Sequence, residues 1–167
     1  PEHPAILAVQ LEFGGALAVN GELTRAAPQL DAAERGMRRL RNRVGLINAL
    51  RWKAYLGVHQ QRFDESIGFA REAVALAQTS ASTPADKRVL MEASLALAGA
   101  LGSAQRRGRL EPTRRAYELA RELYADRPAV PLLHARSLFA YAEILEGDGS
   151  RGVAELKSLV PQQIAAL

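Results

Sequence analysis

The sequence predicts an all-helical protein built from repeated helix pairs, and three observations support this prediction. Hydrophobic residues make up 48% of the 167 residues, enough to bury a core. Aromatic residues make up only 5%, whereas β-rich folds favour aromatic and β-branched side chains. Apolar residues recur at steps of three and four along most of the chain, which is the period of a helix with one buried face. We therefore expect an all-α fold.

The first helix pair is predicted at residues 4–41. Its first helix carries an apolar stripe formed by Ile6, Val9, Phe13, Ala16 and Leu17. Gly21 is expected to end this helix, because glycine accepts backbone conformations that other residues avoid. The second helix follows from Leu23, and Pro28 lies early enough in it to be tolerated or to kink its first turns.

The second pair, at residues 43–79, contains the clearest helix of the chain. Within this pair, residues 43–60 form one helix and residues 63–78 form the other. Asp64 and Glu65 lie in the first turn of the latter, where the positive end of the helix dipole favours carboxylates. Its apolar stripe consists of Phe63, Ile67, Ala70, Val74 and Ala77. Because one amphipathic helix cannot bury its face alone, neighbouring helices must cover it.

The third pair is predicted at residues 85–126, after a loop rich in Ser, Thr and Pro at residues 78–84. Its first helix should run to Arg107 and end at Gly108. Its second helix begins near Leu110 and should end where Asp126-Arg127-Pro128 interrupts the helical pattern.

The fourth pair is predicted at residues 129–160. A turn at 147–149 separates its helices, Ser150 should cap the second, and Pro161 should end it. The turns within the four pairs lie at Gly21, Gln61, Gly108 and Gly147, which are 40, 47 and 39 residues apart. A spacing close to the length of one helix pair predicts a stack of about four antiparallel pairs.

Two segments resemble the second helix of a tetratricopeptide repeat (TPR). Residues 63–67 read F-D-E-S-I and residues 71–76 read R-E-A-V-A-L, similar to that helix in the family. Residues 110–123 match it again through Thr113, Tyr117 and Ala120. The resemblance covers the chain and implies a right-handed α-solenoid, a TPR-like superhelix, as one domain over residues 1–167. The repeats are longer than usual for the family and look like those in sensor regions of large bacterial transcription regulators of the LuxR type.

The resemblance also implies which side chains face a ligand. In this family the first helix of each pair lines the concave groove. The second pair would present Asn48, Arg51, Tyr55 and His59, and the other pairs would add Arg106, His134, Ser137 and Tyr141. Such side chains can hydrogen-bond a peptide backbone, and arginine can bind a carboxylate through two hydrogen bonds. An ordinary solvated helix face is the alternative interpretation. For Leu11, Gly15 and Ala18 of the first pair we expect a place in the core.

A cluster of arginines offers another partner class. The cluster contains Arg38, Arg39, Arg41 and Arg43, and the net charge of the chain is +4. Guanidinium groups bind phosphates, so nucleic acid is a possible partner. No aromatic residues lie between these arginines, and cations near a helix C-terminus are also stabilised by the dipole. We therefore rank nucleic-acid binding below peptide binding.

The sequence gives little support for catalysis. His3, His59 and His134 lie far apart without the spacing of metal ligands, and no glycine-rich phosphate loop is present. The chain has no cysteine, which excludes thiolate metal sites and disulfides. No apolar run reaches the roughly 20 residues that span a bilayer. We expect no enzyme, cofactor, metal or membrane association, and a cytoplasmic location.

The sequence leaves several functions open. A module of a larger regulatory protein that binds a peptide, a protein segment or a small effector in its groove is the main prediction. The chain begins with Pro1 and ends in an apolar segment, which is typical of a fragment of a longer protein. Terminal repeats of such a fragment would expose apolar faces, so a structural scaffold or a homo-oligomer is the alternative.

Overall fold

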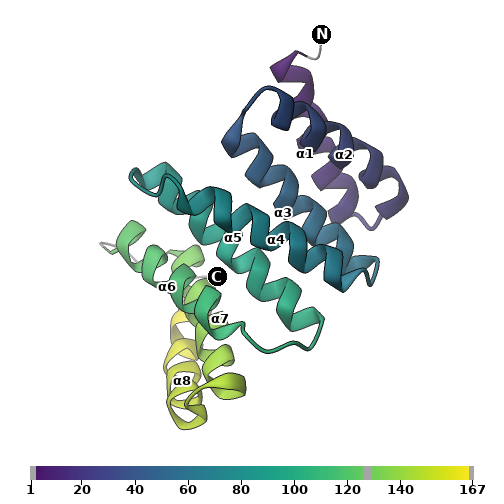
Figure 1. Cartoon of the computed structure of the whole chain (residues 1–167). Helices are drawn as coiled ribbons and strands as arrows, with labels where there is room; N and C mark the ends of the chain where they lie inside the picture. The colour runs from purple at the N-terminus through teal and green to yellow at the C-terminus, as the bar shows by residue number, and fades with distance from the viewer. Residues whose placement is uncertain (1–2, 126–128, 166–167) are drawn as a thin grey trace.

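The structure is a computed structural model that describes residues 3–125 and 129–165, with the backbone alone for 162–165. All regular secondary structure in these residues is helical, which confirms the predicted all-α class. The helices follow one another in a row from the N-terminal to the C-terminal end (Figure 1). They are α1 (Pro4–Val19), α2 (Leu23–Arg39), α3 (Arg43–His59), α4 (Phe63–Gln78), α5 (Pro84–Ser103), α6 (Leu110–Leu123), α7 (Val130–Glu146) and α8 (Gly149–Ala165).

Packing between the helices follows a regular order. Each helix packs against the next one in the chain, and α3 also contacts both α1 and α5. Because the chain reverses direction at each short turn, α1, α3 and α5 run the same way and lie side by side. The helices α2 and α4 cover them from the other side. In this arrangement the exposed side of α3 lies between the exposed sides of α1 and α5.

Four helices end in the same backbone geometry. The residues after them have positive φ angles, and they are Gly21 (80°), Arg41 (52°), Gln61 (59°) and Gln105 (52°). In each case the next amide donates a hydrogen bond of 2.8–2.9 Å to the carbonyl five residues earlier. This pair of features is the Schellman motif, which satisfies carbonyls left free at a helix end. The caps at 21, 41 and 61 give the first three helices a regular spacing of 20 residues.

Small side chains allow close approach between the helices of a pair. Ser66 of α4 is fully buried against α3, and its hydroxyl donates a hydrogen bond of 2.7 Å to the carbonyl of Ala54. A methyl group at Gly57 would lie 3.0 Å from Cβ of Ser66. In α6 the buried Thr113 donates a hydrogen bond of 2.8 Å to the carbonyl of Arg109 within its own helix. The small motif residues Ser66 and Thr113 are therefore both buried, each with its hydroxyl bonded to a backbone carbonyl.

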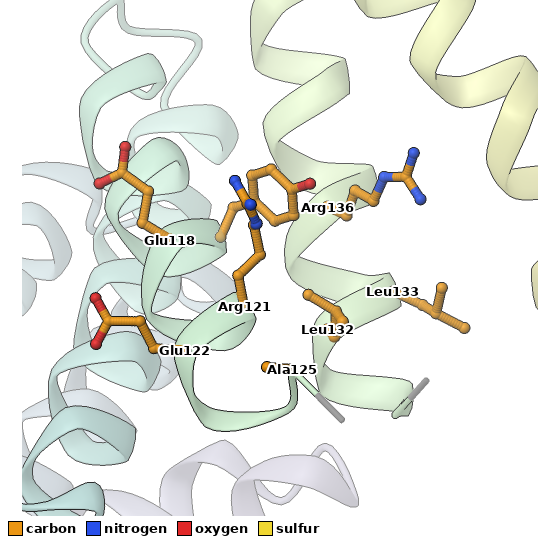
Figure 2. Close-up of a pocket in the computed structure, with 8 residues that line it drawn as sticks. Glu118, Arg121, Glu122, Ala125, Leu132, Leu133 and Arg136 are labelled. Atoms are coloured by element: carbon orange, nitrogen blue, oxygen red, sulfur yellow. The ribbon is translucent and has the colours of Figure 1, made fainter. Parts of the chain in front are cut away.

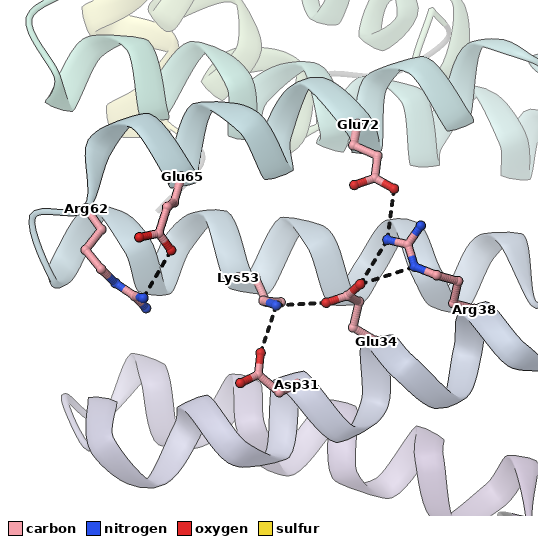
Figure 3. Close-up of polar contacts among 7 residues, drawn as sticks. All are labelled: Asp31, Glu34, Arg38, Lys53, Arg62, Glu65 and Glu72. Atoms are coloured by element: carbon pink, nitrogen blue, oxygen red, sulfur yellow. Dashed lines mark hydrogen bonds and ion pairs between the residues drawn. The ribbon is translucent and has the colours of Figure 1, made fainter.

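A polar network joins α2, α3 and α4 (Figure 3). The ammonium of Lys53 lies 2.8 Å from both Asp31 and Glu34, and 4.4 Å from the ring centroid of Phe69. Arg38 pairs with Glu34 and with Glu72, both at 2.9 Å. The side chains of Lys53 and Glu34 are only 14% and 16% exposed. The network therefore ties three helices together at the edge of the core.

Electrostatics in this network favour the charged forms. Burial raises the pKa of Glu34, but hydrogen bonds from Lys53 and Arg38 more than offset this, so its pKa lies below the ordinary value of 4.5. Burial lowers the pKa of Lys53, and hydrogen bonds to Asp31 and Glu34 raise it above its ordinary value of 10.5. Each partner thus stabilises the charge of the other.

The first helix differs from its prediction. The predicted stripe of Ile6, Val9 and Phe13 faces solvent, with 58%, 67% and 46% of these residues exposed. The core side of α1 is formed instead by Leu7, Leu11, Gly14, Gly15, Leu17 and Ala18. The helix is apolar all round, with Glu12 as its single charged residue. Periodicity therefore could not decide which side is buried. The expectation that Leu11, Gly15 and Ala18 belong to the core is confirmed.

Two predicted helix boundaries are wrong. The fifth helix ends at Ser103 rather than at Arg107, because the Schellman cap forms at Gln105, three residues before Gly108, whose φ is also positive. The last helix continues past Pro161 to Ala165 instead of ending there.

A predicted helix cap is wrong too. The carboxylate of Asp148, not Ser150, caps the last helix by accepting a hydrogen bond of 3.1 Å from the amide of Arg151. The predicted break at residues 126–128 lies outside the described residues. Pro28 remains inside α2 without ending it.

Candidate functional site

A groove of about 500 Å³ lies between α3 and α5. Three of the predicted site residues on α3 line it, namely Arg51, Tyr55 and His59. They lie at steps of four residues, so the helix presents them on one side. The facing side of α5 contributes Glu92, Leu95, Ala96, Gly99, Ala100 and Ser103. Most of the groove surface is therefore apolar, with polar groups at a few defined points.

Aromatic rings form one wall of this groove. The ring of Tyr55 meets that of Trp52 edge to face, with centroids 5.8 Å apart. On its other side it lies 4.3 Å from the ring of His59. Trp52 itself packs over Gly15 of α1, where a methyl group would lie 2.6 Å from the indole. The rings of Trp52, Tyr55 and His59 thus form a row, and contact with α1 holds Trp52 at one end of it.

Arg51 provides the charged group of the groove. Its guanidinium pairs with Glu92 of α5 at 2.5 Å and donates a hydrogen bond of 3.0 Å to Asn48 on its own helix. The predicted residue Asn48 therefore orients Arg51 instead of lining the groove. Among the described residues, Nε of Arg51 is buried without a hydrogen-bond partner. The pair with Glu92 holds α3 and α5 together at one end of the groove.

A second hollow adjoins the groove along α5. Gly99 and Ser103 of α5 line both the groove and a space of about 360 Å³ between α5, α6 and α7. Tyr141 and Leu138 of α7 line that second space. A methyl group at Gly99 would meet no neighbouring heavy atom of the described residues within 4 Å. Glycine at this position therefore leaves the floor open without serving the packing of the chain. We call the two neighbouring hollows the α3–α5–α7 groove.

The remaining predicted residues lie elsewhere. Arg106 pairs with Asp64 at the start of α4, at 2.6 Å, and does not line the groove. Ser137 donates a hydrogen bond of 2.8 Å to the carbonyl of Leu133 within α7. His134 is exposed on the same helix. Tyr141 is thus the predicted site residue of α7 that the structure brings to the groove.

Arg38 and Arg43 of the arginine cluster are engaged with carboxylates. Arg38 belongs to the network of Figure 3, and Arg43 pairs with Asp86 of α5 at 2.8 Å. Asp86 also completes a capping box with Thr83 at the start of α5. Arg41 occupies the left-handed position after α2 and is exposed. Neutralisation by Glu34, Glu72 and Asp86 lowers the positive potential that a phosphate backbone would meet.

A larger pocket, of about 610 Å³, lies between α6 and α7 (Figure 2). Glu118 and Glu122 point away from α7, whereas Arg121 and Leu132 lie between the two helices. Two of its charged groups pair with residues outside the pocket lining. Arg136 pairs with Glu155 at 2.5 Å, and Glu122 pairs with Lys87 at 2.6 Å. Residues 126–128, outside the described part, adjoin this pocket in the sequence. We therefore take the α3–α5–α7 groove as the candidate site.

Sequence reasoning missed the contribution of α5 to this site. Glu92 and Gly99 were not among the residues predicted to face a ligand, and Arg106 was the predicted site residue of this segment. Gly99 itself could have indicated the site. A glycine inside an alanine-rich helix lowers helix stability relative to alanine, so its presence there suggests another role. The role of Trp52 depends on its contact with Gly15, far away in the sequence.

Two other classes of site, for a metal ion and for a membrane, find no support in the described residues. Within 3–125 and 129–165, no group of three or more His, Asp or Glu side chains is arranged to hold a metal ion. No helix in this part of the chain is long and apolar enough to cross a membrane. Comparison with protein-family models and with curated proteins finds no match to this chain. The candidate site is therefore argued from its geometry.

Proposed function

We propose that this chain is a recognition module that binds an extended peptide or protein segment in the α3–α5–α7 groove. The observation that carries this proposal is that two neighbouring hollows share Gly99 and Ser103 in their lining. A groove that passes from α3 over α5 to α7 suits an extended chain better than a compact effector. Its apolar surface would accept side chains, and Arg51 and Ser103 would hydrogen-bond the peptide backbone.

The arrangement of helices supports an α-solenoid of the TPR type. In such a solenoid the first helices of successive pairs lie side by side on the concave side. The contacts of α3 with α1 and α5 are consistent with this order. We propose that the stack is a right-handed superhelix and that α1, α3, α5 and α7 line its concave side.

The proposed context is a larger regulatory protein. Lengthened repeats similar to those of bacterial LuxR-type regulators would place this module in a cytoplasmic sensor or interaction region. In that role it would bind its partner without chemical conversion.

Selection from a displayed library of random dodecapeptides tests this function. We expect enriched peptides that bind the chain saturably in a calorimetric titration. A Gly99→Leu variant should lose binding, because the new side chain would fill the floor of the groove. Gly68→Leu is the matched control, since Gly68 is also a helical glycine without packing neighbours, on α4. Equal binding by both variants would contradict the site, and the absence of any enriched peptide would contradict the function.

A further inference from the structure

The exposed side of α1 repeats a pattern that is buried elsewhere in the protein. The Schellman caps at Gly21, Gln61 and Gln105 align α1, α3 and α5 without reference to burial. Counting back 15, 12, 8 and 5 residues from each cap gives three equivalent sets. They are Ile6, Val9, Phe13 and Ala16 in α1; Leu46, Ala49, Lys53 and Leu56 in α3; and Leu90, Ala93, Leu97 and Ala100 in α5.

In α3 and α5 a preceding helix covers these positions. Ala49 and Leu56 belong to the same core cluster as Leu30 and Ala33 of α2, and Lys53 pairs with two carboxylates of that helix. In α5, Leu90 and Ala93 belong to one cluster with Ala73, Val74 and Ala77 of α4. Ala100 belongs to a cluster with Ile67 and Ala70. The apolar members of the sets in α3 and α5 are buried, except Leu97, which is partly buried.

In α1 the equivalent set is open to solvent. Ile6, Val9 and Phe13 are about half exposed or more, and Ala16 is exposed beside them. All four are apolar, whereas α3 has Lys53 at the position of Phe13. Side chains of this size, gathered on one side of a helix, favour contact with another apolar surface. We call these four residues the open face of α1.

We propose that the open face of α1 is a docking site for an amphipathic helix of the type of α4. The occupant follows from the equivalent positions, which α2 and α4 cover through stripes rich in alanine. Val9 is larger than its equivalents Ala49 and Ala93, and the ring of Phe13 is larger than the aliphatic stem of its equivalent Lys53. A partner helix would therefore need small residues opposite Val9 and Phe13. Glu12 is the single charged residue of α1, so a basic or neutral flank suits the partner.

A tethered helix tests the proposal on the whole chain. A second copy of residues 63–83, which form α4 and its following loop, is placed directly before Pro4. Tethering raises the effective concentration of the helix, so weak docking becomes measurable. We expect the thermal midpoint to rise by about 4 °C relative to the parent chain. The rise should disappear when Val9→Glu and Phe13→Glu are introduced, because the charged side chains would be buried under the added helix.

Two controls separate helix docking from a general effect of the tether and from self-association. Val19→Glu in the same tethered chain should keep the rise, because Val19 is exposed on α1 but lies outside the open face. Sedimentation of the parent chain should show a monomer. An unchanged midpoint in the tethered chain, or a rise that survives Val9→Glu with Phe13→Glu, would overturn the proposal. Self-association of the parent chain that Val9→Glu abolishes would overturn it too, since the occupant would then be a second copy.

Discussion

Arg51 and Lys53 lie two residues apart on α3 and have different surroundings. Lys53 faces α2, where its side chain is 14% exposed and contacts two carboxylates at 2.8 Å. Arg51 faces α5, pairs with one carboxylate and lines an apolar groove with Tyr55. Two residues turn the side chain through about 200° around a helix. Position around the helix therefore places one cation in the contact with α2 and the other beside the groove, where it pairs with α5.

The largest effect should come from removing the cation on the α2 side. Lys53→Ala would leave Glu34, which is 16% exposed, without one of its two cations. Breaking a partly buried pair strands a desolvated charge, so we expect a loss of about 2 kcal/mol in the free energy of unfolding. Urea denaturation measures this loss.

Arg62→Ala serves as the control for that experiment. Arg62 pairs with Glu65 at 3.1 Å, and both side chains are about half exposed (Figure 3). Exposed pairs contribute little, so the expected loss is below about 0.5 kcal/mol. Equal losses in the two variants would contradict the distinction between a buried and an exposed network.

The second effect concerns binding rather than stability. The Arg51→Ala, Tyr55→Ala double variant should lower the affinity for a selected peptide by about tenfold or more, because it removes a donor and an aromatic surface. Its free energy of unfolding should change by less than that of Lys53→Ala. A calorimetric titration together with urea denaturation separates the two quantities. Lost affinity with an equal loss of stability would show that Arg51 belongs to the fold.

Lowering the pH should weaken the contact between α2 and α3 and reduce the free energy of unfolding. The pKa of Glu34 is lower in the folded protein than in the unfolded chain, so the unfolded chain binds its proton first as pH falls. Its contribution to stability is present above its ordinary pKa of 4.5 and is lost as pH falls through the folded value. Glu34→Gln should flatten this part of a stability profile measured from neutral pH to pH 3. A profile identical to that of the parent would contradict the assignment.

The smallest effect tests the floor of the groove. Gly99→Ala should raise the free energy of unfolding by about 0.5–1 kcal/mol, because alanine favours a helix and meets no neighbour there. Gly68→Ala should give a similar gain on α4. Peptide affinity should fall in the Gly99 variant alone. Equal affinity in the two variants would mean that the peptide does not contact Gly99.

The sequence predicted the helices well where one side of a helix is clearly apolar. The stripe of α4 is an example, since Ile67, Ala70, Val74 and Ala77 are all buried. It also placed Arg51, Tyr55 and His59 on one side of α3, and the structure brings these three to the groove. Both results follow from the helical period, which local sequence records directly.

The remaining features depend on contacts between distant residues. The open face of α1 could not be distinguished from its core side, because both are apolar. The end of α5 depends on Gln105, a residue type that rarely adopts positive φ, while Gly108 nearby offered a better cap by composition. The opposite wall of the groove, with Glu92 and Gly99, required knowledge of which helix packs beside α3.

The fluorescence of Trp52 tests the central claim most directly. Trp52 is the single tryptophan of the chain, and it lines the groove beside Tyr55. Titration with a selected peptide should change its emission saturably, with the same dissociation constant as calorimetry gives. That agreement is the result we predict, because a peptide in the groove would displace water from the indole. Calorimetric binding of the same peptide with unchanged Trp52 emission would contradict the claim and move the binding site away from the groove.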